Sequence, residues 1–359
     1  MKYPILNVDL DAIRENAAVM CRFCGSRGID VAGVIKFSDG DTDIAKAYLD
    51  GGCSQIASSR IVHLQKIKEE IPGAETMLIR IPMISEAEEV VKWADMSLNS
   101  EEAVLRELDA AAGRLGRTHR VILMQDVGDR REGVIGSDAL TALALLVENE
   151  LDNLYLAGIG ASFACISGVL PDKDNLGLLA ESARQIETAI GRKLDIVSGG
   201  SSITLTLLAN GKPLPSEINH LRIGGAIANP IGIRLNRGVV IEGMNEDTFT
   251  LTAEIIETGD KPSVSQRGGK NWAGKEVSFE DTGIRTRVIV ALGSQDIGDA
   301  SQLIPKDPGI KITGCSSDHT VLDITDAGKK TNVGDTVSFR LFYMPLLYCF
   351  ATRHVRIEK

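Results

Sequence analysis

Hydrophobic and polar residues follow two different periodicities along this chain, and the change falls near Pro230. Between about residues 30 and 228, short runs rich in β-branched residues alternate with longer segments whose apolar residues recur every three or four positions. That order is typical of parallel strands joined by amphipathic helices. The predicted strands are residues 31–36, 55–58, 76–82, 96–99, 121–126, 154–161, 195–199 and 220–225.

The segment 101–112 shows the helical pattern most clearly. Its apolar face consists of Val104, Leu105, Leu108, Ala111 and Ala112. Asn99 and Glu102 fit a capping box at the start of this helix, and Gly113 is expected to end it.

Eight strand-and-helix units over about 200 residues favour a closed (β/α)8 barrel of the TIM type, an α/β fold. A miscount by one strand would admit an open, doubly wound sheet instead. In barrels of this type the chemistry lies at the carboxyl ends of the strands. The residues that end each run are therefore the first candidates for a functional site.

After Pro230 the pattern becomes a strict alternation, as in residues 249–255. Residues 337–343 repeat it, with Tyr343 in phase with the apolar positions. Such alternation predicts a second, mainly antiparallel β domain. We expect domains at 1–230 and 231–359 and leave open whether the first few residues join the second domain. The polar segment 261–276 is expected to be a loop, and its run G-K-N-W-A-G-K lacks the Ser or Thr that completes a nucleotide-binding P-loop.

Composition narrows the classes of partner. The chain has 39 Lys and Arg against 49 Asp and Glu in 359 residues, so a nucleic-acid-binding surface is not expected. No apolar run approaches the roughly 18 residues needed to span a bilayer, and the first residues do not resemble a signal peptide. We expect a cytoplasmic protein that does not enter membranes.

The six cysteines are scattered, which favours reduced thiols over a disulfide framework. Cys21 and Cys24 form the only close pair in the sequence. Their spacing would suit redox chemistry or half of a zinc site, but no second pair has metal-site spacing and the segment has a helical pattern. We expect no metal.

Lys36 ends the first predicted barrel strand, where desolvation would lower the pKa of its amine and favour imine formation. The simpler interpretation is a surface lysine or an ion-paired lysine. Glycine-rich turns end the last two strands, where barrels most often bind phosphate, although glycine pairs also mark ordinary turns. The candidate phosphate-binding residues are Gly200, Ser201, Ser202, Gly224 and Gly225. A lysine that can form an imine and these phosphate-binding residues together indicate a phosphorylated aldehyde as cofactor.

Several segments resemble, in order and spacing, the alanine racemase superfamily. They are V-D-L-D-A-I-R-E-N, A-G-V-I-K, D-V-G-D-R-R-E-G-V, G-I-G-A-S-F-A-C, V-S-G-G-S-S and H-L-R-I-G-G-A-I. The later segments L-G-S-Q-D, G-C-S-S-D-H-T-V-L-D and V-G-D-T-V-S-F-R-L-F-Y are more similar to the branch containing ornithine and other amino-acid racemases. The resemblance covers nearly the whole chain.

The resemblance implies a role for each matching residue. Lys36 would carry pyridoxal 5'-phosphate as a Schiff base and serve as one acid/base group. Arg222 would donate to the pyridine nitrogen of the cofactor and keep it unprotonated. Ser202, Gly225 and Tyr343 would contact the phosphate, although the position of Tyr343 also suits a packed core residue.

Other roles concern the substrate and the assembly. Arg131 would lie near the phenolic oxygen of the cofactor, unless it forms only a surface ion pair. Ser317 and Asp318 would bind the substrate carboxylate from the neighbouring subunit, which implies a head-to-tail homodimer.

The sequence departs from alanine racemase at three places. The tyrosine of a G-Y-A-D motif, which is the second base there, is absent from the aligned run at 293–296. Ser162 replaces the imidazole that backs the cofactor ring, and Gly40 replaces a tyrosine. Loss of bulky side chains would leave more room beyond the α-carbon. The candidates for the missing base are His319, Asp318 and, third, Asp296, which is also a substrate-binding candidate.

Three functions remain open from the sequence. The first is a racemase or epimerase of a free amino acid, with a basic substrate such as ornithine or lysine favoured by resemblance. The second is a lyase of the D-threonine aldolase type, in which Asp318 and His319 would help to hold a metal ion. The third is a non-catalytic pyridoxal-phosphate-binding protein, against which the predicted β domain counts.

Overall fold

A computed structural model describes residues 2–264, 269–270, 274, 276–277 and 280–359. The chain divides into two compact units. One is Leu10–Glu246, and the other joins the residues up to Asp9 to Asp247–Lys359. The helices among the described residues include none that could span a lipid bilayer. Of the run G-K-N-W-A-G-K, positions 271–273 and 275 lie outside the described residues.

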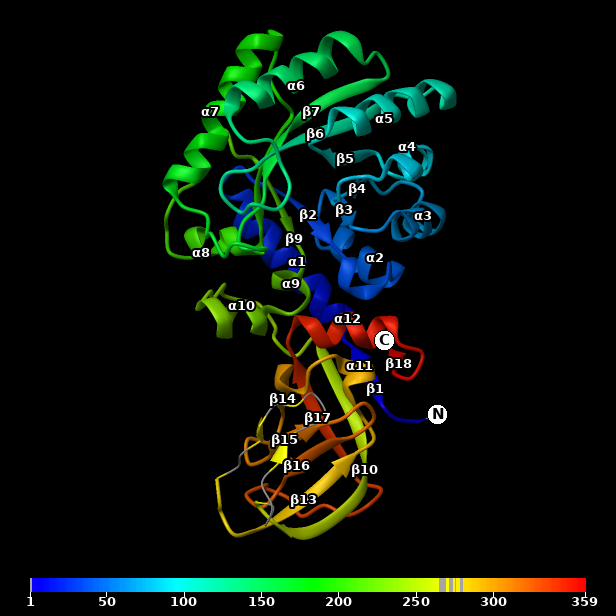
Figure 1. Cartoon of the computed structure of the whole chain (residues 1–359), viewed down its shortest axis with the longest axis vertical. Helices are drawn as coiled ribbons and strands as arrows, with labels where there is room; N and C mark the ends of the chain where they lie inside the picture. The colour runs from blue at the N-terminus through cyan, green and yellow to red at the C-terminus, as the bar shows by residue number, and fades with distance from the viewer. Residues whose placement is uncertain (1, 265–268, 271–273, 275, 278–279) are drawn as a thin grey trace. The chain divides into compact units, whose positions relative to one another are not determined.

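The strands of the first unit close into a barrel of eight parallel strands (Figure 1). They are β2 (Asp30–Val34), β3 (Gln55–Ser58), β4 (Thr76–Leu78), β5 (Met96–Asn99), β6 (His119–Gln125), β7 (Leu154–Ala161), β8 (Ile196–Ser201) and β9 (His220–Ile223). The barrel closes where β2 pairs with β9, with Asp30 opposite His220. The predicted (β/α)8 barrel is therefore confirmed, and an open sheet is excluded.

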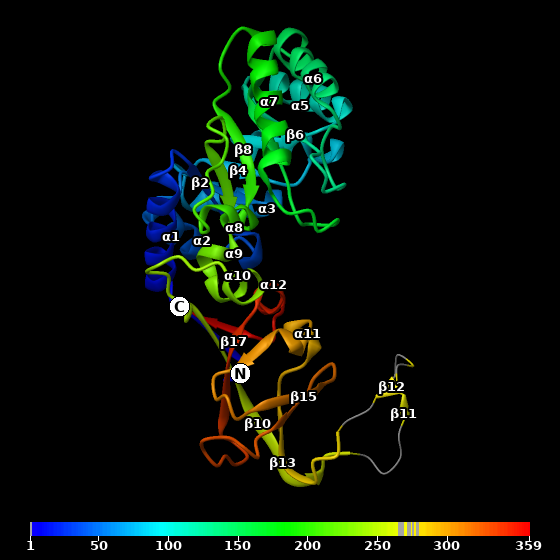
Figure 2. The same ribbon diagram turned by 90° about the vertical axis from the view of Figure 1, so that its left-hand side faces the viewer.

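Helix α1 precedes the first barrel strand, and the other helices of this unit follow barrel strands along the chain. They are α1 (Leu10–Gly25), α2 (Thr42–Asp50), α3 (Ile61–Glu70), α4 (Ala87–Trp93), α5 (Glu102–Leu115), α6 (Ser137–Glu150), α7 (Lys173–Ile190) and the short α8 (Leu205–Leu208), α9 (Gly225–Ala228) and α10 (Pro230–Arg237). Helices α6 and α7 lie side by side (Figure 2), and both contact β7. Since the unit runs to Glu246, α10 groups with the barrel, whereas the sequence pattern places the boundary at Pro230.

Hydrophobic core residues lie on both sides of the barrel wall. Along β6, Val121 and Leu123 join the core shared with the helices, whereas Ile122 and Met124 join the core inside the barrel. This alternation follows from the strand period of two. It explains why the parallel strands appear in the sequence as continuous apolar runs.

Helix α5 differs from its predicted ends. All five residues of its predicted apolar face are buried. However, the helix continues through Gly113 to Leu115 and ends at Gly116, which has a φ of 61°. Asn99 does not cap it, because the residue before the helix is Glu101 and no side chain there makes a capping hydrogen bond. The Asn99 side-chain amide instead donates to the Ser97 carbonyl (2.9 Å). The predicted capping box is therefore wrong.

The second unit is built around an antiparallel sheet in the order β14-β17-β10-β13-β16-β15. These strands are β10 (Phe249–Pro262), β13 (Ile284–Val290), β14 (Leu303–Pro305), β15 (Lys311–Cys315), β16 (Thr320–Asp323) and β17 (Thr336–Leu341). Strand β1 (Ile5–Val8) pairs antiparallel with β10 and parallel with β18 (Arg356–Glu358). Strand β11 (Gly269–Lys270) pairs antiparallel with β12 (Glu276–Val277). The predicted antiparallel second domain is confirmed.

Tyr343 is not part of the last long strand. Strand β17 ends at Leu341, and Tyr343 is the first residue of α12 (Tyr343–Ala351). Pro345 lies in the first turn of that helix, where its missing N–H breaks no intrahelical hydrogen bond. The period-two pattern extends to Tyr343 only by coincidence.

Candidate active site

Lys36 lies directly beyond the carboxyl end of β2, at the start of a 3-10 turn over Lys36–Ser38. The lysine is exposed, whereas Ile35 and Phe37 on either side are buried. Enough protein surrounds the amine for desolvation to lower the pKa of Lys36, and the positive charge of Arg131 lowers it further. A lowered pKa increases the neutral fraction of the amine, which is the nucleophilic form.

Arg222 is a buried cation on β9, with 5% of its surface exposed. Its guanidinium donates to the Ala161 carbonyl (2.8 Å) and the Ser198 hydroxyl, and more weakly to the Ser162 hydroxyl (3.4 Å). Burial lowers the pKa of Arg222 to about 10. It therefore remains protonated at neutral pH and acts only as a donor.

Ser162 follows β7 and connects the two site arginines. Its hydroxyl donates to Glu132 Oε1 (2.8 Å) and accepts from Arg131 Nη2 (3.1 Å). Glu132 forms an ion pair with Arg131. Glu132 is not among the site residues predicted from the sequence, although it directly follows Arg131 in the D-V-G-D-R-R-E-G-V segment. The negative charge of Glu132 raises the pKa of Lys36, opposing the two arginines.

The loop that carries Arg131 is held by two aspartates. Asp126 Oδ1 accepts from the backbone N–H groups of Gly128 (2.8 Å) and Arg130 (3.2 Å). Asp129 Oδ1 accepts from the N–H of Cys165 (2.9 Å), in the segment after β7. Burial alone would raise the pKa of Asp129, but the backbone N–H donors after β7 outweigh it and lower the pKa. These bonds join the loops after β6 and β7 at the same end of the barrel.

The glycine turns lie at the ends of neighbouring strands, since Ser201 on β8 pairs with Arg222 on β9. Gly200 has a φ of 105°, and a Cβ on it would lie 2.8 Å from the Phe163 ring and from Thr204 Oγ1. At Gly224 a Cβ would lie 2.6 Å from the Val34 carbonyl oxygen. Both positions therefore require glycine. Ser201, Ser202 and Gly225 are partly exposed beside these turns.

His63, which is not among the site residues predicted from the sequence, holds the turn after Lys36. His63 Nε2 lies 3.1 Å from Asp39 Oδ1, and His63 Nδ1 lies 2.9 Å from the Ser58 hydroxyl at the end of β3. Desolvation lowers the pKa of His63, against the opposing charge of Asp39. A Cβ on Gly40 would lie 2.9 Å from both Cα and Cβ of His63. His63 thereby links the Lys36 turn to the next strand.

The remaining predicted residues lie in the second unit. Ser317, Asp318 and His319 occupy the exposed turn between β15 and β16. Asp318 accepts from Ser317 Oγ (2.7 Å) and from Gln295 Nε2 (3.2 Å). Gln295 belongs to the short helix α11 (Ser294–Ile297), so this helix and the turn lie together.

Two of the predicted residues in this unit have other contacts. Asp296 is buried, and its carboxylate accepts from the Gly293 N–H (3.0 Å). Tyr343 is half-buried at the start of α12, and burial raises the pKa of its hydroxyl. The structure thus brings Lys36, Arg131, Ser162 and Arg222 together in the barrel, and the Ser317 turn beside α11 in the second unit.

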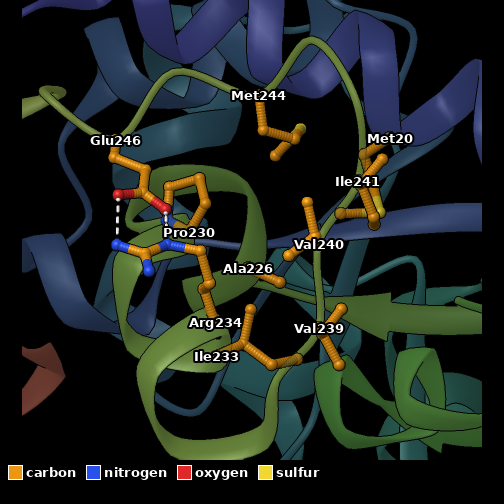
Figure 3. A pocket seen from close by; sticks show the side chains of 10 residues that line it. All are labelled: Met20, Ala226, Pro230, Ile233, Arg234, Val239, Val240, Ile241, Met244 and Glu246. Atoms are coloured by element: carbon orange, nitrogen blue, oxygen red, sulfur yellow. Dashed lines mark hydrogen bonds and ion pairs between the residues drawn. The ribbon is translucent and has the colours of Figure 1, made fainter.

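One cavity of the barrel unit is separate from these residues. It has a volume of about 100 Å³ and lies between α1, α10 and the segment 239–246 (Figure 3). Its lining is apolar except for the ion pair between Arg234 and Glu246. Within the described residues, no group of three or more His, Cys, Asp and Glu side chains is arranged to hold a metal ion.

Comparison with known proteins agrees with this arrangement. The family model for the alanine racemase N-terminal domain matches residues 8–229. The chain is 37% identical over 357 residues to the ornithine racemase of Acetoanaerobium sticklandii, covering 99% of both chains. It is 38% identical over 348 residues to the lysine racemase of Thermotoga maritima, covering 97% of this chain and 96% of the other.

A solved structure shares the whole fold. The alanine racemase of Streptomyces coelicolor A3(2) superposes with a TM-score of 0.75 at 18% identity, covering 99% of this chain and 97% of that one. The resemblance found in the sequence motifs is thereby confirmed, and the chain belongs to the alanine racemase family.

Proposed function

We propose that this protein is a pyridoxal-phosphate-dependent racemase of a free basic amino acid, such as ornithine or lysine. The group formed by Lys36, Arg131, Ser162 and Arg222 at the carboxyl end of the barrel carries the proposal. The choice of a basic substrate rests on the similarity to the ornithine and lysine racemases.

The barrel residues fit pyridoxal phosphate. Glycine at 200 and 224 lets the two strand ends pack closely against Phe163 and the Val34 carbonyl. The partly exposed hydroxyls of Ser201 and Ser202, with neighbouring backbone N–H groups, would contact the phosphate. Arg222 offers a buried donor of the kind that would face the pyridine nitrogen. When bound, the cofactor would withdraw electrons from the substrate α-carbon and make its proton acidic.

The residues of the chain would then hold and move protons. Lys36, with its lowered pKa, would hold the cofactor and exchange the α-proton on one face of the substrate. Arg222 would remain charged and would not take part in proton transfer. Ser162 and Glu132 would fix Arg131 for its contact with the cofactor oxygen.

Racemisation needs a second proton carrier on the opposite face. Of the three candidates, Asp296 is buried and already caps the Gly293 N–H, and Asp318 is oriented by Gln295 and Ser317. His319 is exposed, and the hydrogen bonds that fix it in its turn involve its backbone. We therefore favour His319 as the carrier.

The turn with Ser317, Asp318 and His319 would serve the barrel of a second subunit. Ser317 and Asp318 would orient the substrate carboxylate there, which makes the active unit a head-to-tail homodimer. Tyr343 would contribute to the phosphate contacts. The proposed location is the cytoplasm, where free amino acids are available.

Chiral chromatography after incubation with single enantiomers tests the function. With pyridoxal phosphate present, incubation with one enantiomer of ornithine or lysine should produce a mixture of the two enantiomers. Formation of glycine and an aldehyde from a β-hydroxy amino acid would instead establish a lyase. Absence of turnover with every amino acid in the panel would leave a non-catalytic binding protein.

Borohydride reduction tests the cofactor residue in the same preparation. Reduction should attach the cofactor to Lys36 and block tryptic cleavage there, so that residues 28–36 and 37–46 appear as one peptide, 28–46. Lys36→Ala should lose both the visible absorbance band of the bound cofactor and this peptide. Attachment at another lysine would overturn the assignment.

A further inference from the structure

Cys21 has a thiol partner that its sequence neighbours do not reveal. Its Sγ lies 3.8 Å from Sγ of Cys53, in the segment between α2 and β3. In the sequence, the nearest cysteine to Cys21 is Cys24, three residues later on α1. In the structure, the thiol of Cys21 instead lies beside that of Cys53, which is far from it in the sequence but belongs to a neighbouring segment of the barrel unit.

The backbones around these two thiols are already close. A Cβ on Gly51 would lie 2.3 Å from the Ala17 Cβ of α1, and a Cβ on Gly52 would lie 3.5 Å from the Cys21 Cβ. A disulfide needs sulfurs about 2.05 Å apart. Because the two segments are packed against each other, side-chain rotation can supply much of this approach.

The two thiols differ in exposure and acidity. Cys21 is partly exposed, whereas Cys53 is 5% exposed and Cys24 is fully buried. A hydrogen bond with Cys53 lowers the pKa of Cys21. Burial raises the pKa of Cys24 to about 12. Cys21 is therefore the nucleophile of this cluster, because reaction with oxidants requires the thiolate.

We propose that Cys21 and Cys53 are a peroxide-sensitive thiol pair that closes to a disulfide within one subunit. The Cys21 thiolate attacks hydrogen peroxide, and with one proton this gives a sulfenic acid and water. The Cys53 sulfur then attacks the Cys21 sulfur, and hydroxide leaves with the Cys53 proton as a second water. In total, two thiols and one peroxide give one disulfide and two waters.

The disulfide would tie α1 to the segment that enters β3. Cys53 Sγ also lies 3.2 Å from the position of a Cβ on Gly33, in β2, the strand that leads to Lys36. Oxidation would therefore add a covalent link beside the strand that positions the catalytic lysine. The inference does not depend on the proposed racemase activity, since it concerns only these thiols.

Tryptic mapping without reducing agent tests the proposal, because trypsin separates the three cysteines. Cys21 falls in peptide 15–22, Cys24 in 23–27 and Cys53 in 47–60. After treatment of the full-length protein with hydrogen peroxide, 15–22 should be joined to 47–60, with two hydrogens fewer than the separate peptides. A link from 23–27, or oxidation of both peptides to sulfinic acids without a link, would overturn the proposal.

Two variants and one labelling experiment complete the test. Cys21→Ser should abolish the link, and the matched change Cys24→Ala should retain it. Before oxidation, iodoacetamide should label peptide 15–22 several-fold faster than 23–27, because only Cys21 is accessible and acidified. Equal labelling rates, or a link that survives Cys21→Ser, would exclude Cys21 as the reacting thiol.

Discussion

Replacement of Gly200 by alanine should damage both the stability of the barrel and its affinity for pyridoxal phosphate. At a φ of 105°, a non-glycine residue costs about 1–3 kcal/mol. The new methyl group would also lie 2.8 Å from the Phe163 ring and Thr204 Oγ1, closer than the 3.4 Å at which ordinary contact begins. Overpacking of this kind adds about 1–3 kcal/mol. We therefore expect a loss of about 2–6 kcal/mol in the free energy of unfolding.

Two other glycines on α7 supply matched controls. Gly191 ends the helix with a φ of 73° and open space around it, so Gly191→Ala should cost only the strain, about 1–2 kcal/mol. Gly177 lies inside the helix with nothing near its missing Cβ, so Gly177→Ala should stabilise by about 0.5–1 kcal/mol. We expect Gly200→Ala to be the least stable of the three variants, because only there does the new methyl group meet other side chains, those of Phe163 and Thr204.

Urea unfolding followed by circular dichroism gives the three changes in free energy. Equilibrium dialysis with pyridoxal phosphate gives the affinity, which should fall only in Gly200→Ala, because that turn is the proposed phosphate contact. If Gly200→Ala unfolds at the same urea concentration as Gly191→Ala, the close approach of Phe163 and Thr204 is refuted. If it also binds the cofactor normally, the phosphate assignment is refuted too.

Three further predictions concern protons and assembly. Mixing inactive Lys36→Ala and Asp318→Ala proteins should restore part of the activity through mixed dimers, and an active monomer would contradict this. Burial lowers the pKa of His119 to about 4 and that of His220 to about 3. Between these values and the ordinary histidine pKa of about 6.5, the two imidazoles are protonated in the unfolded chain but neutral in the folded chain. Stability should therefore fall by about 1.4 kcal/mol per pH unit for each histidine as the pH drops from about 6.5 to about 4 for His119 and about 3 for His220. His119→Asn should reduce this slope in urea unfolding. In deuterated water, His319→Ala should lose racemisation but still exchange the α-proton of one enantiomer, and full racemase activity would exclude His319.

The barrel could be predicted from the sequence because each of its strands is a short apolar run that can be recognised by itself. A run such as Val121, Ile122, Leu123 and Met124 is buried on both faces, so it stands out without knowledge of the rest of the fold. The ends of elements were less predictable. Gly113 resembles a helix end, but the helix continues to Gly116, where a positive φ is needed.

Site residues could be predicted where they lie at the end of a strand. They could not be predicted where two residues far apart in the sequence come into contact. Lys36 and the glycine turns are strand-end residues, which barrel geometry identifies. His63 and Asp39 are 24 positions apart and meet only once β2 and β3 are side by side. The pairing of Cys21 with Cys53 has the same origin, since periodicity within one helix favours Cys24 as the partner.

The structure changes the interpretation of Gly40. Its replacement of a tyrosine suggests from the sequence that the site gains room for a longer substrate. In the structure, the space into which a side chain at Gly40 would project is occupied by His63, whose Cα and Cβ lie 2.9 Å from the missing Cβ. His63 is itself held by Ser58 and Asp39. The glycine therefore allows the Lys36 turn to pack against α3, and any selectivity for a basic side chain must come from other residues of the site.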